Sequence, residues 1–207
     1  AARSPRRASR GVWRADGRPR ARILANCAII RFVELRQFFD RALGASFRDL
    51  ALGDDPAAPY LADLLTRFAR TEHLFPRGVA VPRLETVVDM LLETQAVWRE
   101  DTAWWEPERE VAVRRHIGDF TLFMTGLFRE RVERTASAGF YIAQGKRAYH
   151  FVSEHDRASA RASTAAGAPL YRRLADRFER YAAALEYARK AHFGDPPQHP
   201  FFRLNFG

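Results

Sequence analysis

A histidine and an aspartate lie close together in the most unusual stretch of this sequence, the segment from His116 to Phe128. His116 and Asp119 are three residues apart, so on a helix the imidazole and the carboxylate can share a face. Such a pair could act as a general acid and base, or ligate a metal ion. It could equally be a structural contact that fixes the register of the helices.

The surroundings of Asp119 decide between these two interpretations. A carboxylate is costly to bury without a partner, so we expect one of four groups beside it: His116, Lys146, Arg147 or a tyrosine hydroxyl of the helix predicted at residues 137–156. A satisfied contact in a dry core would make Asp119 part of the architecture. A carboxylate facing a cavity beside His116 would make it a catalytic candidate.

Two glycines flank Asp119 in the same apolar stretch. Gly118 and Gly126 are eight residues apart, slightly more than two helical turns, and so lie on nearly one face. Glycine costs about 0.5–1 kcal/mol relative to alanine inside a helix, which indicates a steric reason for its presence. Either another helix packs closely here, or the glycines leave space for a flat or bulky ligand.

A second polar cluster lies in the segment from Lys146 to Asp156. Lys146, Arg147, Tyr149 and His150 are further candidates for lining a ligand pocket. His150 and Glu154 are four residues apart on one helical face, a spacing that suits a metal ion bound to a helix. However, the Glu-x-x-His repeats of dimetal bundles and the His-Glu-x-x-His motif are both absent from the sequence. No cofactor is indicated.

The elements that must position these residues are helices. Apolar residues recur at spacings of three and four, and no segment alternates as a strand would. We predict an all-α, compact bundle of about six helices, with the apolar stretch 117–128 at its centre. The predicted helices span residues 25–43, where Gly44 would cap the C-terminus, 57–73, where Asp54 or Asp55 would cap the N-terminus, 83–99, 106–130, 137–156 and 169–192.

The last predicted helix carries a heptad-like seam, in which apolar residues alternate at spacings of four and three. Such a seam could serve an interface, as could the tryptophans at positions 98, 104 and 105. The seam consists of Leu174, Phe178, Tyr181, Leu185, Ala188 and His192.

Composition separates a basic leader from a nearly neutral body. Residues 1–22 hold eight arginines and one acidic residue, a net charge of +7, whereas the rest of the chain contributes only +2 to the total of +9. We predict a disordered, arginine-rich leader over 1–22 and one helical domain over 23–207. Nucleic acid would then bind only through the leader, by neutralisation of phosphate charge.

Neither the arginine pair at 6–7 nor the lone Cys27 makes a secretion or lipidation signal, because arginines interrupt the apolar run that such a signal needs. No window reaches the length of a membrane span. The sequence favours a soluble, intracellular protein of the cytoplasm. Import into an organelle through the arginine-rich leader is the alternative.

No motif names a reaction, so three function classes remain open. The first is a non-catalytic helical protein that acts through protein–protein contacts, with a protein partner or as a homo-oligomer. The second is a small-molecule-binding or enzymatic helical domain with a pocket centred on His116 and Asp119. The third is a protein associated with nucleic acid through its basic leader.

Overall fold

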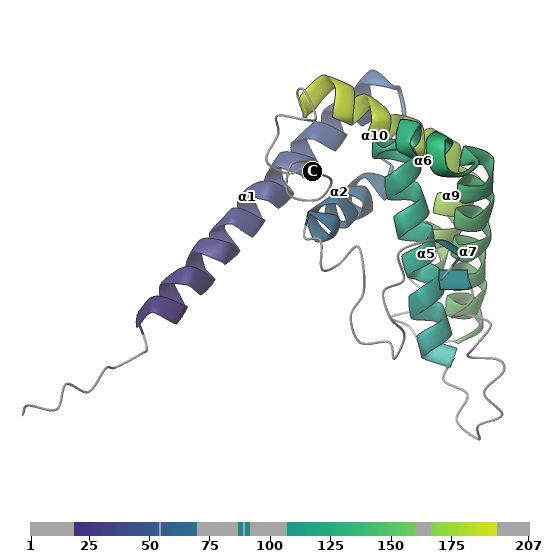
Figure 1. The fold of residues 1–207 in the computed structure, drawn as a ribbon, viewed down its shortest axis with the longest axis horizontal. Coiled ribbons are helices and arrows are strands. Elements are labelled where there is room, and N and C mark those ends of the chain that lie inside the picture. The colour runs from purple at the N-terminus through teal and green to yellow at the C-terminus, as the bar shows by residue number, and fades with distance from the viewer. Residues whose placement is uncertain are drawn as a thin grey trace, which may run out of the picture. The chain divides into compact units, whose positions relative to one another are not determined.

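The computed structural model describes residues 19–53, 55–69, 87–88, 90–91, 107–159 and 167–193, and most of these residues are helical (Figure 1). The all-α prediction is confirmed. The chain divides into two units, Ala1–Glu34 and Leu35–Gly207, and the buried core belongs to the second. The helices are α1 (Pro19–Asp49), α2 (Ala57–Phe68), α5 (Pro107–Leu127), α6 (Arg129–Thr135), α7 (Ala138–Ala158), α9 (Ala168–Asp176) and α10 (Phe178–His192).

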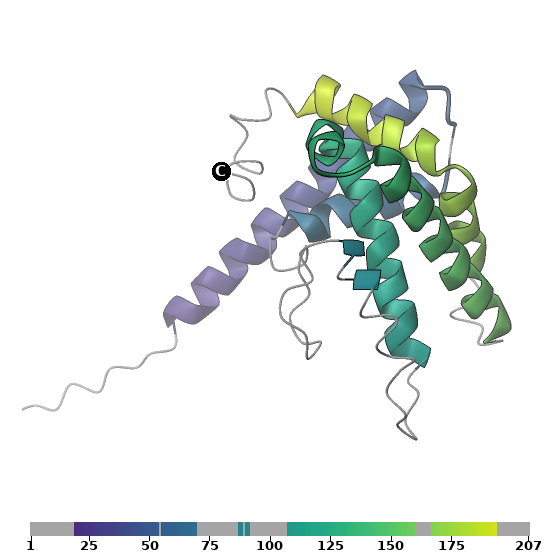
Figure 2. The same cartoon turned by 45° about the vertical axis from the view of Figure 1, so that its right-hand side comes forward.

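Helix α5 is the centre of the second unit, as its apolar sequence predicted. Every residue from Ile117 to Leu127 is buried. Helix α7 runs beside α5, α10 crosses it, and α2 and α6 also contact it (Figure 2). An apolar surface on all sides of a helix requires neighbours on all sides, because each exposed apolar group would cost free energy in water.

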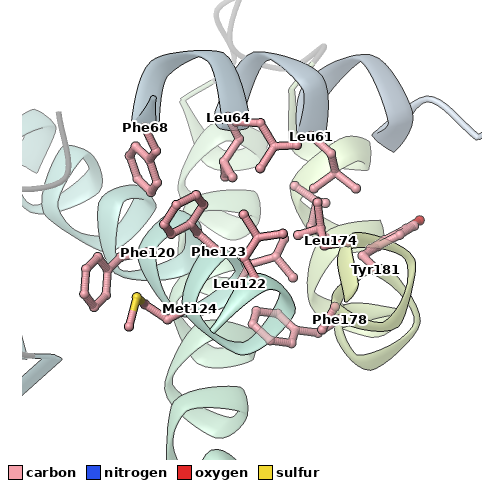
Figure 3. Close-up of a cluster of buried hydrophobic side chains, with 14 of the residues drawn as sticks. Leu61, Leu64, Phe68, Phe120, Leu122, Phe123, Met124, Leu174, Phe178 and Tyr181 are labelled. Carbon is pink, nitrogen blue, oxygen red and sulfur yellow. The ribbon is translucent and has the colours of Figure 1, made fainter. Parts of the chain in front are cut away.

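The core gathers apolar side chains from α1, α2, α5, α6, α7, α9 and α10. Leu61, Leu64 and Phe68 of α2 face Phe123 of α5, while α9 and α10 contribute apolar side chains from the other side (Figure 3). The rings of Phe68 and Phe123 meet edge to face, with centroids 5.2 Å apart. This geometry is the one that aromatic quadrupoles favour.

Two of the predicted helices are each divided in two. The helix expected at 106–130 ends at Leu127, where Phe128 leaves the helical conformation (φ −128°, ψ 34°) before α6 begins. The helix expected at 169–192 is interrupted at Arg177 (φ −113°, ψ 23°). Both breaks redirect the chain so that apolar side chains on either side reach the core.

The predicted contact seam therefore lies inside the molecule. Its apolar members, from Leu174 on α9 to Ala188 on α10, are fully buried against the rest of the domain. A buried stripe cannot also present itself to a partner protein. The heptad spacing thus describes packing within the chain.

Gly44 does not end a helix, contrary to the prediction, because α1 continues to Asp49. The residues after Gly44 have packing partners that favour continuation: Phe47 is buried and stacks on Tyr181, with ring centroids 6.2 Å apart and planes 10° apart. The chain then turns through positive φ at Ala51 (52°) and Gly53 (69°). Burial of Phe47 outweighs the helix-ending preference of glycine.

Other predictions lie largely outside the described residues. Of the predicted leader, only 19–22 are described, and they form the first turn of α1. Of the helix predicted at 83–99, four residues are described. Val87 is buried, and Val88 is 53% exposed. The tryptophans at 98, 104 and 105 lie outside the described residues. None of the described helices combines the length and the hydropathy of a membrane-spanning segment.

Candidate functional site

The buried carboxylate of Asp119 is the centre of the principal polar cluster. The side chain is 1% exposed, and two helices, α2 and α7, supply its partners. Tyr149 of α7 and Tyr60 of α2 both donate their hydroxyls to Oδ1, at 2.8 Å and 2.5 Å. The Arg67 guanidinium of α2 donates to Oδ2 at 3.0 Å. Both carboxylate oxygens are therefore engaged by groups of the fold, and a tyrosine of the predicted fifth helix is among them, as expected.

A third tyrosine and a second arginine complete the cluster. The ring of Tyr171 on α9 stacks on that of Tyr149 and meets that of Tyr60 edge to face, with centroids 6.0 Å and 5.9 Å apart. The Tyr171 hydroxyl interacts with Arg115, whose pKa is raised by this contact although burial alone would lower it. Stacked rings and charge-assisted hydrogen bonds together hold four helices around Asp119.

The electrostatics of the cluster keep its tyrosines protonated. Burial raises the pKa of Tyr149 and of Tyr60 well above the usual value near 10, and the adjacent Asp119 carboxylate raises both further. Burial would lower the pKa of Arg67, but its contacts with Asp119, Tyr60 and Asp63 together outweigh burial and raise the pKa. Each group is thus held in the form in which it donates a hydrogen bond to Asp119.

The two glycines beside Asp119 make room for neighbouring side chains. A Cβ at Gly118 would lie 2.7–2.9 Å from the ring of Tyr149. A Cβ at Gly126 would lie 2.6 Å from Cβ of Leu185 on α10. Such distances are shorter than van der Waals contact, so only glycine permits this approach. A side chain of the fold fills the space above each glycine, and Gly126 also lies in the lining of the surface hollow described below.

His116 does not pair with Asp119, although the two are three residues apart. Its ring packs between aromatic residues, with centroids 5.7 Å from Phe68 and 6.2 Å from Phe120. The carboxylate instead turns toward α2 and α7. The acid and base of the proposed catalytic pair therefore face different surroundings.

The second predicted cluster, on α7, does not converge on a pocket. Tyr149 points into the core, Lys146 pairs with Glu179 at 2.9 Å, and Arg147 is exposed. His150 lies 3.5 Å from Asp176, whereas Glu154 pairs with Arg157 and Arg172. The imidazole and the carboxylate proposed as metal ligands thus face different partners. Within the described ranges, no group of three His, Cys, Asp or Glu side chains could hold a metal ion.

A second buried aspartate repeats the chemistry of the first. Asp55 caps α2, as predicted, by accepting a hydrogen bond from the backbone N–H of Ala57 at 3.0 Å. Its other oxygen accepts a hydrogen bond from the Tyr181 hydroxyl at 2.8 Å, and Arg173 and Arg177 lie 3.6 Å and 3.3 Å away. Burial, with the hydrogen bond to Asp55, raises the pKa of Tyr181. Both aspartates tie α2 to other helices.

Sequence reasoning missed Tyr60 and Arg67 as partners of Asp119. They are seven residues apart, two helical turns, so they share a face of the helix 57–73 next to its apolar stripe. That spacing was a usable signal. It could not reveal that this face packs on α5, because spacing within one helix does not specify its neighbour.

A surface hollow lies apart from the Asp119 cluster, where the chain turns from α5 into α6 beside α10. Its volume is about 350 Å³. Four arginines and three glutamates line it together with the last residues of α5. The lining residues are Gly126, Leu127, Phe128, Arg129, Glu130, Arg131, Glu133, Arg134, Glu186 and Arg189.

Taken together, the Asp119 cluster can act as a clamp between helices, because its acceptor oxygens and donor hydroxyls are already matched. The hollow beside α6 can bind, because it is open and carries charged groups. No protein-family model matches the chain, and no curated protein or solved structure is significantly similar to it.

Proposed function

We propose that this chain is a non-catalytic helical domain that acts by binding another protein. One observation carries the proposal: the strongest catalytic candidate, Asp119, is 1% exposed, and both of its oxygens accept hydrogen bonds from its own fold, from Tyr60, Arg67 and Tyr149. A general base needs a free lone pair within reach of a substrate proton. The charged residues that remain available lie at the surface.

The surface of interest is the hollow beside α6, in place of the buried seam on α9 and α10. Protein interfaces are enriched in arginine, and their rims are polar. The hollow combines arginines with the apolar edge of Phe128, which is half-buried. This composition is typical of a contact surface for a protein.

Two alternatives are less well supported. A small-molecule or enzymatic pocket at His116 and Asp119 would need the space above Gly118, which the Tyr149 ring occupies. Binding of nucleic acid through the leader depends on residues 1–18, which lie outside the described residues.

The proposal is tested by reconstitution. The full chain is used to capture proteins from its source cells, and each captured protein is purified and titrated against the chain by calorimetry. We expect at least one to bind with defined stoichiometry. The bound protein can also be a second copy of this chain. Sedimentation of the chain alone tests for such self-association.

A chain that sediments as a strict monomer and gives no reconstitutable complex would contradict the proposal. A variant with Asp119→Asn tests separately whether the buried carboxylate contributes to binding of the partner. If this variant stays folded and still binds the reconstituted partner, the carboxylate has no part in binding.

A further inference from the structure

We infer that the hollow beside α6 binds a carboxylate side chain of an acidic partner segment, and that Arg189 and Arg134 hold it. The inference rests on the proposed function, since it names the chemistry of the partner. It is carried by the charge pattern of the hollow and by the surroundings of Arg189.

Most of the glutamates in the hollow are already neutralised. Glu133 pairs with Arg129 at 2.9 Å, and Glu186 pairs with Lys190 at 2.7 Å. Each pair joins residues four apart on one helix and needs nothing from outside. The positive charge of Arg129 is therefore also used within the fold.

Arg134 and Arg189 remain without a carboxylate partner among the residues that the structure describes. Arg134 is exposed in the last turn of α6, and Arg189 is half-buried on α10. Only Glu130 opposes them as a carboxylate without an ion pair in the same described ranges. Besides Arg131, the charged groups of the hollow that have no ion pair in these ranges are thus two guanidinium groups and one carboxylate.

Of the two arginines, Arg189 gives the stronger support for the inference. Its Nε is buried and donates to no acceptor within the described part of the chain. A buried donor without an acceptor costs about 1–3 kcal/mol, and more for a charged group. A carboxylate seated in the hollow would supply acceptors in the bidentate geometry that a guanidinium favours. Binding would therefore remove the free-energy cost of the unsatisfied Nε donor in the free protein.

The same pattern disfavours a polyanion such as nucleic acid. Only Arg134 and Arg189 are offered to an anion, so a chain of phosphates would bring more negative charge than these two arginines can neutralise. A volume of about 350 Å³ admits one or two side chains of a peptide. Phe128, which is half-buried, offers apolar contact to the methylene groups of an aspartate or glutamate. A short acidic peptide segment fits these constraints.

The inference is tested with a fluorescent, glutamate-rich peptide and its glutamine counterpart, titrated into the full chain by anisotropy. The arginines of residues 1–22 contribute a background that is the same in every variant. We expect Arg189→Ala to weaken binding of the acidic peptide by about tenfold or more. The matched control Arg180→Ala, exposed on α10 outside the hollow, should change it by less than about twofold.

A second variant is expected to gain affinity, because a loss of affinity alone could also result from misfolding. Glu130→Gln removes the opposing carboxylate, so we expect the acidic peptide to bind severalfold more tightly and the glutamine peptide to be unaffected. Amide resonances of 126–134 and 186–190 should shift on addition of the acidic peptide. Equal effects of the Arg189 and Arg180 variants, or no gain in the Glu130 variant, would overturn the inference.

Two competing anions test whether the hollow prefers a peptide carboxylate to phosphate or nucleic acid. Inorganic phosphate and a single-stranded oligonucleotide are added to the peptide complex, and we expect neither to displace the peptide through Arg189. Oligonucleotide binding that is weakened tenfold by Arg189→Ala would overturn the inference in favour of nucleic acid. A reconstituted protein partner that binds equally well to the Arg189→Ala variant would also overturn it, while leaving the proposed function intact.

Discussion

At the scale of single residues, Asp119 shows how a buried charge becomes part of a fold. The carboxylate lies inside an apolar helix, and two phenols and one guanidinium surround it. Each partner comes from a different turn or helix, so the contact specifies one arrangement of α2, α5 and α7. Polar groups in a core specify one arrangement because a misplaced polar group costs more free energy than a misplaced apolar group.

Removing this carboxylate should strongly destabilise the protein. We expect Asp119→Ala to lower the free energy of unfolding by about 3 kcal/mol, because Tyr149, Tyr60 and Arg67 would all lose their acceptor. Urea denaturation followed by circular dichroism measures the change. The control is Asp40→Ala, which breaks the exposed pair with Arg36. It should cost less than about 1 kcal/mol. Equal losses in the two variants would contradict the clamp role of Asp119.

At the scale of elements, close approach between helices depends on residues without a side chain. Gly145 of α7 lies against Phe178 of α10 and against Thr121 of α5, and a Cβ would overlap both side chains. Gly44 of α1 is different, because its Cβ would meet only Arg48, at an ordinary 3.7 Å. The two helical glycines therefore differ in what surrounds them.

Substitution by alanine should have opposite effects at these two positions. We expect Gly145→Ala to destabilise the protein by about 1–3 kcal/mol through overpacking. Gly44→Ala should stabilise it by up to about 1 kcal/mol, because alanine favours the helix and nothing obstructs it. Thermal unfolding of both variants against the natural chain measures the difference. A stabilising Gly145→Ala would show that α7 and α10 can separate at no cost.

At the scale of the whole molecule, the buried tyrosines predict how stability depends on pH. The pKa values of Tyr60 and Tyr149 are raised by burial and by Asp119. The folded protein thus keeps these protons at pH values where the unfolded chain, with a pKa near 10, releases them. Their contribution is fully present below about pH 10 and is lost as the pH rises through the folded-state values.

We therefore expect the free energy of unfolding to fall in alkali because of the buried tyrosines, in addition to any effect of the net charge. Above about pH 10, stability should fall by about 1.4 kcal/mol per pH unit for a tyrosine that stays protonated, such as Tyr149. Urea midpoints measured between about pH 8 and pH 11 give the slope. Tyr149→Phe should be less stable at neutral pH but show a shallower alkaline loss. Parallel curves for the two proteins would rule out this role of the phenol.

The sequence by itself determined the helical class, the central position of the 117–128 stretch and the burial of Asp119. These follow from local rules: apolar residues on all faces of a helix must be covered, and an acid among them is covered too. The cap at Asp55 follows from the same local chemistry.

Only the tertiary structure decided which groups form hydrogen bonds with Asp119 and where the helices break. Tyr60 and Arg67 lie more than fifty residues before Asp119, and their contact depends on which face of α2 packs on α5. The breaks at Phe128 and Arg177 redirect α6 and α10 toward core contacts that no local window contains. Periodicity defines the faces of a helix, whereas the choice among partners for each face is made by the packing of the whole chain.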